Sequence, residues 1–118
     1  MKFLALAAAA LLSTSALAAE PLKKTDAGFV DAAGMTVYTF DKDVAGSGKS
    51  ACADGCLKNW PAVAASGALA APWSAITRDD GSKQLAYKGK PLYLFVGDKK
   101  AGDRNGDNVK EIWHVAKD

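Results

Sequence analysis

The chain has 118 residues, a formal net charge of +2 and a hydrophobic fraction of 49%. This length suffices for one small domain, and the nearly balanced charge excludes a basic surface that would hold nucleic acid or an anionic membrane. From residue 19 onward, 18 residues are Leu, Ile, Val or Phe and 17 are Ala. We therefore expect a modest core built largely from small side chains.

The N-terminus has the three-part layout of a secretory signal peptide. Lys2 precedes an apolar run over residues 3–12, and the small-x-small triplet Ala16-Leu17-Ala18 follows. The run is too short for a membrane span, which needs roughly 20 apolar residues. We expect residues 1–18 to be cleaved, which would leave a protein without a membrane anchor in the periplasm or outside the cell.

Short β-prone runs, separated by Gly and Asp, follow a polar lead at residues 19–27. This pattern favours antiparallel strands joined by tight turns. The strands expected in chain order are 29–30, 35–40, 74–78, 83–87, 91–96 and 109–115, with turns at 33–34, 79–82 and 88–90 and polar loops at 41–50 and 98–108. Residues 63–71 are rich in Ala and predict no single element.

The chain has two cysteines, Cys52 and Cys56. Exported proteins meet an oxidising environment, so we favour a disulfide between them, which for so short a loop would contribute about 2 kcal/mol. A metal-binding or redox-active pair stays an alternative, although thioredoxin-like motifs have two intervening residues and not three. Residues 52–59 can form a short helical turn that ends at Trp60-Pro61, because a residue before proline disfavours helix.

The most specific feature is an internal duplication. Residues 34–43 align without gaps on residues 89–98, and a tryptophan and then a valine follow each copy. The recurring residues are Tyr38, Phe40, Asp43, Trp60 and Val63 in the first copy and Tyr93, Phe95, Asp98, Trp113 and Val115 in the second. We infer two repeats, at about 28–65 and 74–118, that pack face to face or share a sheet because neither closes a core alone.

The predicted fold class is mainly β: a small single domain, residues 28–118, of two duplicated β-hairpin units packed as an antiparallel sheet or small sandwich. In each unit Tyr and Phe lie two residues apart, so they project from one face of a strand about 7 Å apart. The Asp follows where the strand ends, where its carboxylate can accept backbone N–H groups and hold the loop. We favour this structural role over a ligand or ion site formed by Asp43, Asp98 and the tyrosines.

These motifs resemble a known family. Two copies of Tyr-x-aromatic-x-x-Asp, Cys52-x-x-x-Cys56, Trp60-Pro61 and Trp113 are together similar to the bacterial secreted-repeat family of predicted lipoproteins, which has no assigned activity. The resemblance covers about residues 28–115 and implies export and a duplicated β unit, but no catalytic residues. The chain departs from the lipoprotein pattern because no cysteine stands at the expected cleavage site to take a lipid.

Metal binding is the sharpest alternative function. The soft or borderline donors after residue 18 are Cys52, Cys56, His114 and Met35. Thiolates with imidazole or thioether would suit copper, and thiolates with imidazole would also suit zinc. His114 follows Trp113 in an expected strand, where a partly exposed surface histidine is the ordinary interpretation.

Calcium binding and catalysis have less support. Counted from Asp103, the sixth and twelfth positions of an EF-hand loop hold Asn108 and His114 instead of Gly and Glu. The sequence contains one His and neither a nucleophile elbow nor a phosphate-binding Gly loop. A redox role for the cysteine pair is the one enzyme-like option.

We therefore predict an exported, non-enzymatic module that binds an envelope protein or a small ligand. Exposed tyrosines and tryptophans could supply the contacts, although the core needs these rings first. No cofactor is expected. The alternative is a periplasmic copper or zinc handling protein that uses Cys52, Cys56 and His114.

Overall fold

The computed structural model describes residues 20–118, so the expected signal peptide lies outside the described residues. The described chain is mainly β, as predicted. Its elements are β1 (Lys23–Thr25), β2 (Gly28–Val30), β3 (Tyr38–Phe40), α2 (Gly55–Asn59), β4 (Trp73–Thr77), β5 (Lys83–Tyr87), β6 (Lys90–Pro91), the 3-10 turn η2 (Val109–Glu111) and β7 (Trp113–Val115). Within this part of the chain, no helix is long and apolar enough to cross a membrane.

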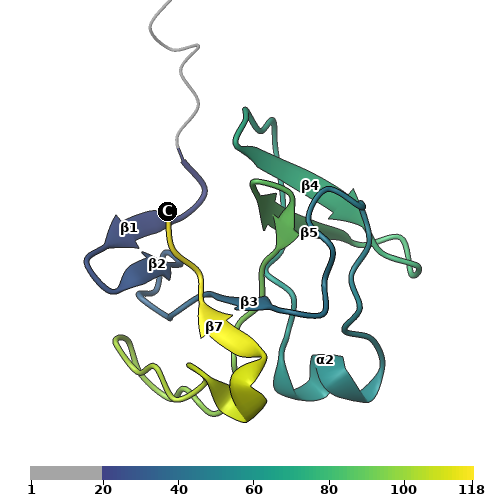
Figure 1. The fold of residues 1–118 in the computed structure, drawn as a ribbon. Helices are drawn as coiled ribbons and strands as arrows, with labels where there is room; N and C mark the ends of the chain where they lie inside the picture. Colours follow the sequence, from purple (N-terminus) through teal and green to yellow (C-terminus); the bar gives the residue numbers. More distant parts are fainter. Residues whose placement is uncertain (1–19) are drawn as a thin grey trace, which may run out of the picture.

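The strands form three small antiparallel sheets, β1-β2, β3-β7 and β4-β5-β6. Figure 1 shows β3 and β7 at the centre, with the β1-β2 ribbon on one side and β4 and β5 on the other. Because β3 comes from the first repeat and β7 from the second, the central sheet joins the two repeats. The expected short helical turn is present as α2.

The predicted hairpin at residues 74–87 is confirmed. β4 and β5 pair over five residues, from Trp73 opposite Tyr87 to Thr77 opposite Lys83. Asp80 accepts the backbone N–H of Ser82 at 2.9 Å inside the turn. This bond is the local interaction that favours Asp-Gly sequences between strands.

The polar lead contains a strand, which the expectation for residues 19–27 missed. β1 pairs with β2 in a tight ribbon, with Thr25 opposite Gly28. The Thr25 hydroxyl donates to the carbonyl of Gly28 at 2.7 Å and closes the turn. Leu22 and Phe29 are buried in the core and anchor both strands of the ribbon, so β1 forms although its own side chains are exposed.

Two further expected strands are shorter than predicted because their residues change partners. Strand 35–40 narrows to β3, and of the expected strand 91–96 only Pro91 lies in a strand, β6, which begins one residue earlier at Lys90. Along the second segment, Leu92 N donates to Leu85 O, Tyr93 N to Tyr38 O and Leu94 N to Pro61 O. The backbone is therefore hydrogen-bonded residue by residue to three different segments, which leaves no continuous ladder.

The expected last strand, 109–115, is also wrong in its first half. Residues Val109–Glu111 form η2, and only β7 is extended. Asn108 begins the turn with φ 66°, in the left-handed region that Asn tolerates better than most residues. The turn ends with a hydrogen bond of 3.1 Å from Ile112 N to Val109 O.

The two repeats are related around a central pair of tyrosines. Tyr38 N donates to Tyr93 O at 2.7 Å, and Tyr93 N donates to Tyr38 O at 2.9 Å. Equivalent backbone bonds follow on both sides: Ala116 N to Val37 O and Val63 N to Leu92 O, then Asp41 N to Ile112 O and Val96 N to Asn59 O. The backbone around Tyr38 and Tyr93 therefore has an approximate two-fold relation.

Each tyrosine strand pairs with the tryptophan segment of the other repeat. We call residues 60–64 and 113–117 the tryptophan segments. Tyr38 lies opposite Val115 in the β3-β7 pair, whereas Tyr93 bridges Ala62. The repeats therefore share a sheet by exchanging partners, so the folded domain needs both copies.

Candidate functional site

The duplicated motifs form two crossed Tyr–Asp pairs. The Tyr38 hydroxyl donates to Asp98 Oδ2, and the Tyr93 hydroxyl donates to Asp43 Oδ2, both at 2.6 Å. Both tyrosine side chains are fully buried. Each motif therefore supplies the phenol for one pair and the carboxylate for the other.

The same carboxylates hold the two long loops. Asp43 Oδ1 accepts the backbone N–H of Ala51 at 2.6 Å, and Asp98 Oδ1 accepts that of Asn105 at 2.9 Å. Such charge-assisted bonds order a loop more strongly than neutral ones. The motif aspartates thus act on backbone N–H groups as well as on the tyrosines.

Burial is the main cause of the shifted acidities at these pairs. It raises the pKa of Tyr38 and of Tyr93 well above the ordinary value, and the bonded carboxylates raise them further. Burial also raises the pKa of Asp43, against the lowering effect of the Ala51 N–H and the Tyr93 hydroxyl. Both phenols are therefore neutral donors over the physiological pH range.

The motif phenylalanines and tryptophans form a continuous stack of four rings. Trp60 and Trp113 lie face to face, with centroids 3.8 Å apart and planes 2° apart. Phe40 stacks on Trp113 at 4.1 Å, and Phe95 stacks on Trp60 at 4.3 Å. Because each tryptophan packs between its counterpart and a phenylalanine of the other repeat, the stack joins the copies.

Glycine at position 106 is required by the close approach of these rings. A Cβ atom there would lie 2.8 Å from the Trp60 ring and 2.9 Å from the Tyr38 ring. The Gly106 N–H instead donates to the Tyr38 hydroxyl at 3.1 Å.

The tyrosines and tryptophans do not form an exposed contact surface, so that part of the expectation is wrong. Their exposed fractions are 0–9%: Tyr38, Tyr87, Tyr93, Trp60, Trp73 and Trp113. In a chain with few large aliphatic residues, the core needs these rings. Any binding surface must therefore use other residues.

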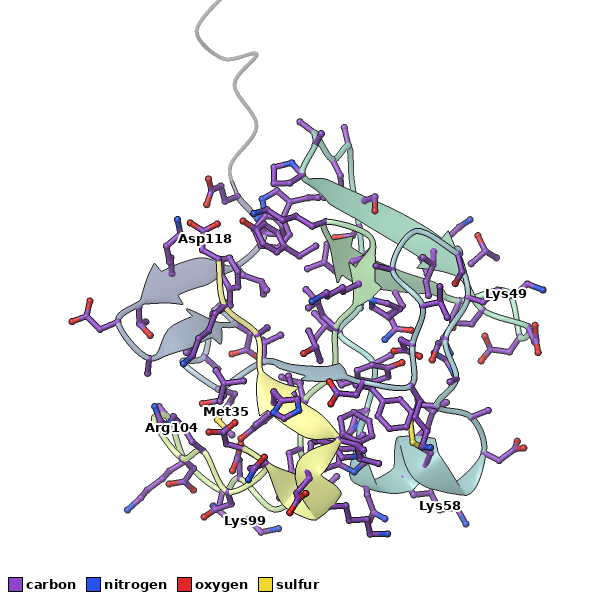
Figure 2. The ribbon with its side chains drawn as sticks, in the orientation of Figure 1. Met35, Lys49, Lys58, Lys99, Arg104 and Asp118 are labelled. Atoms are coloured by element: carbon purple, nitrogen blue, oxygen red, sulfur yellow. A yellow bond between two sulfur atoms is a disulfide. The ribbon has the colours of Figure 1, made fainter. Side chains whose placement is uncertain are left out.

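The cysteines form a disulfide beside α2, seen as the yellow bond in Figure 2. Cys52 is buried in the hydrophobic cluster that contains Trp60 and Trp113, and its carbonyl accepts a hydrogen bond from the Arg78 guanidinium. His114 lies on β7, where its Nε2 is 2.8 Å from Asp41 Oδ2. Across residues 20–118, no three His, Cys, Asp or Glu side chains group closely enough to hold a metal ion.

A cavity of about 300 Å³ opens beside the central sheet, and we call it the β3-β7 cleft. It is lined by Thr39, Asp41, Tyr87, Lys90, Leu92, His114, Val115, Ala116 and Lys117. Thr39 and His114 lie directly opposite each other in the β3-β7 register. Regular strands thus position the polar side chains of this cleft.

Five polar or charged residues of the cleft lie at positions where the two repeats differ. By the gapless alignment, Thr39, Asp41 and Lys90 correspond to Leu94, Val96 and Met35. By the equivalent backbone bonds of the tryptophan segments, His114 and Lys117 correspond to Pro61 and Ala64. The same scaffold therefore carries polar side chains at these positions on one face and apolar side chains on the other.

A second cavity, of about 360 Å³, lies between the loop before α2 and the β4-β5 turn. Its charged lining residues are Lys49, Arg78, Asp54, Asp79 and Asp80. The Arg78 guanidinium is already held by Gln84 Oε1 at 2.6 Å and by the Cys52 carbonyl. Because its one guanidinium serves the fold and its charges largely compensate one another, we favour the β3-β7 cleft as the candidate site.

Thr39, Asp41, Lys90 and Lys117 line the cleft but are not predicted by the recurring motif, because the motif marks only the residues that the two copies share. The informative signal is instead a difference between the two copies at equivalent positions. Asp41 in the first copy stands where the second copy has Val96, which is 42% exposed. Where one copy has a polar residue and the other has an apolar residue at the equivalent position, the shared fold does not require the polar side chain.

A family model described as a secreted repeat of unknown function matches residues 22–64 and 74–117. The first match begins at Leu22, just before β1, and each match contains one copy of the motif and one tryptophan. No curated protein and no solved structure gave a significant match to the chain.

Proposed function

We propose that the chain, which belongs to a family of secreted repeats of unknown function, is a non-enzymatic binding module that holds a small polar ligand in the β3-β7 cleft. Its site of action is outside the cytoplasm, in the periplasm or beyond. The two repeats provide a rigid scaffold, and the cleft provides the binding residues.

The observation that carries this proposal is the difference between the two faces of the scaffold. The shared tyrosines, the shared tryptophans and Asp98 are buried, Asp43 is half-buried, and each tyrosine is hydrogen-bonded to an aspartate, so these residues are occupied in holding the fold. Polar side chains at Thr39, Asp41 and His114 line a cavity, whereas their counterparts are Leu94, Val96 and Pro61. A concave site with a few convergent polar groups is the usual form of a small-molecule site.

Amide-resolved NMR of the secreted protein tests the proposal. The protein is titrated with a defined set of small polar compounds that covers sugars, amino acids, organic acids, phosphates and polyamines. A ligand is expected to shift the backbone amides of Thr39, His114 and Lys117 in a saturable manner. Shifts that map instead to the second cavity, or no saturable shift with any compound, would contradict the proposal.

A matched pair of variants checks the location. Thr39→Phe fills the cleft from β3 and is expected to abolish the saturable shifts. Thr77→Phe makes the same change at an exposed strand position on β4 and is expected to leave them intact. If both variants retained binding, the ligand would lie outside the cleft.

A further inference from the structure

We propose that the ligand of the β3-β7 cleft is a small oxyanion, a compound with a carboxylate or phosphate group, which Lys90 and Lys117 bind. This inference rests on the proposed function and adds the chemical class of the ligand.

The charges of the cleft favour an anion. Its lining includes two lysines, one histidine and a single carboxylate, Asp41. That carboxylate is already bonded to His114 at 2.8 Å. The two ammonium groups outnumber this one carboxylate, so the lining carries an excess of positive charge.

Lys90 and Lys117 have no ion-pair partner within residues 20–118. Their neighbours Lys24 and Lys88 differ, because both reach the Asp118 carboxylate, at 2.6 and 4.0 Å. Lysine binds carboxylate and phosphate groups as a flexible point charge. Two such groups at one cavity provide the charge for an incoming oxyanion.

The scaffold does not need either lysine. Lys90 corresponds to Met35 in the other repeat, and Lys117 corresponds to Ala64. Both lysines are exposed, so neither contributes to the core. Their side chains can therefore bind a ligand without loss of a contact that the fold requires.

The size of the cavity points to a free small molecule. A volume of about 300 Å³ lies at the lower end of the range for small-molecule sites. Leu92, Val115 and Ala116 add apolar surface to its lining. Thr39 adds a hydroxyl that can donate to an anionic oxygen.

The test measures dissociation constants by NMR titration of the secreted protein with sodium succinate and with sodium phosphate. Succinamide and putrescine, the neutral and cationic counterparts of succinate, are titrated in parallel at the same ionic strength. We expect succinate or phosphate to shift the amides of Thr39, His114 and Lys117 with saturation. Lys90→Gln and Lys117→Gln should each weaken binding about twofold to fivefold, as expected for the loss of a solvent-exposed ion pair.

Lys58→Gln is the control, since Lys58 lies on α2 and does not line the cleft, and Figure 2 shows it far from Asp118. It should leave the dissociation constant unchanged. Equal weakening by all three substitutions would indicate attraction to net charge alone and would overturn the assignment to Lys90 and Lys117.

The remaining outcomes separate this inference from the proposed function. Saturable binding of succinamide or putrescine at the cleft, without succinate or phosphate, would overturn the anion and leave the small-ligand site in place. No saturable shift with any of the probes would overturn the inference, and the wider compound set then decides the proposed function. Binding to phosphatidylglycerol vesicles without binding of either free anion would overturn a small-molecule ligand in favour of a lipid surface.

Discussion

The Tyr38 hydroxyl donates a 2.6 Å hydrogen bond to Asp98, which lies 60 residues further along the chain in the other copy of the motif. Tyr93 makes the reciprocal bond to Asp43. Each copy of Tyr-x-Phe-x-x-Asp therefore supplies the tyrosine of one hydrogen-bonded pair and the aspartate of the other. This crossing explains in physical terms why both copies keep the full motif.

Burial of the two phenols predicts loss of stability at high pH. The pKa of Tyr38 and of Tyr93 is raised in the folded state from an ordinary value of 10.0. Above pH 10 the unfolded chain releases these protons and the folded chain retains them, so the free energy of unfolding falls as pH rises. The slope is as much as about 1.4 kcal/mol per pH unit for each tyrosine.

Urea unfolding between pH 8 and about 11 measures this slope. Tyr38→Phe or Tyr93→Phe should reduce it, whereas Tyr87→Phe should retain the part that comes from the two buried phenols. An unfolding free energy that stays constant above pH 10 would show that the phenols are not held neutral by the fold.

The stack of Trp60 on Trp113 predicts a paired-indole signal in near-ultraviolet circular dichroism. Trp60→Phe and Trp113→Phe should each remove the same band and lower the free energy of unfolding by about 0.5–1.5 kcal/mol. Trp73→Phe is the control, because Trp73 packs on Phe29 and Tyr87, which lie outside the four-ring stack. Loss of the band in the Trp73 variant alone would contradict the stack.

The amino-acid pattern predicted the mainly β fold, the duplication and the hairpin at residues 74–87. It did not predict the exchange of partners, because the tryptophan segments of both repeats present the same pattern. Pairing of Tyr38 with segment 60–64 or with segment 113–117 satisfies that pattern equally well. Only the packing of the whole domain selects the second arrangement.

The candidate site was harder to predict than the fold. The residues shared by both copies point to Asp43, Asp98 and the tyrosines as candidates. In the structure these residues are hydrogen-bonded to one another. Lys90 and Lys117 are ordinary exposed lysines in the sequence. The proposed site depends on β6 and the segment that follows β7, which bring the two lysines to one cavity, a juxtaposition that no local pattern encodes.

The disulfide is expected to stabilise the loop without being essential for the fold. Replacing Cys52 and Cys56 with Ser should lower the free energy of unfolding by about 2 kcal/mol. The loop is still held by Asp43, which accepts the Ala51 N–H, and by Arg78 on the Cys52 carbonyl. Amide shifts should change mainly within residues 50–59, and global loss of chemical-shift dispersion would contradict this expectation.

Metal binding is tested with the oxidised and the reduced protein. In the oxidised protein the two sulfurs are bonded to each other, so neither is a thiolate ligand. His114, on β7, is hydrogen-bonded to Asp41. We expect no Cu(I) or zinc in the oxidised protein by native mass spectrometry, and after reduction no binding that depends on His114. Reduced protein whose Cu(I) affinity falls in His114→Ala would establish the metal-handling alternative.

A double-mutant cycle on Tyr38 and Asp98 tests the interlocked scaffold most directly. The free energy of unfolding is measured for Tyr38→Phe, Asp98→Asn and the double variant, and in parallel for Tyr38→Phe with Asp43→Asn. The crossed pair predicts a coupling energy of about 0.5–3 kcal/mol between Tyr38 and Asp98 and additivity within about 0.5 kcal/mol between Tyr38 and Asp43. Coupling between Tyr38 and Asp43, with additivity between Tyr38 and Asp98, would show that each motif closes on itself and would contradict the account.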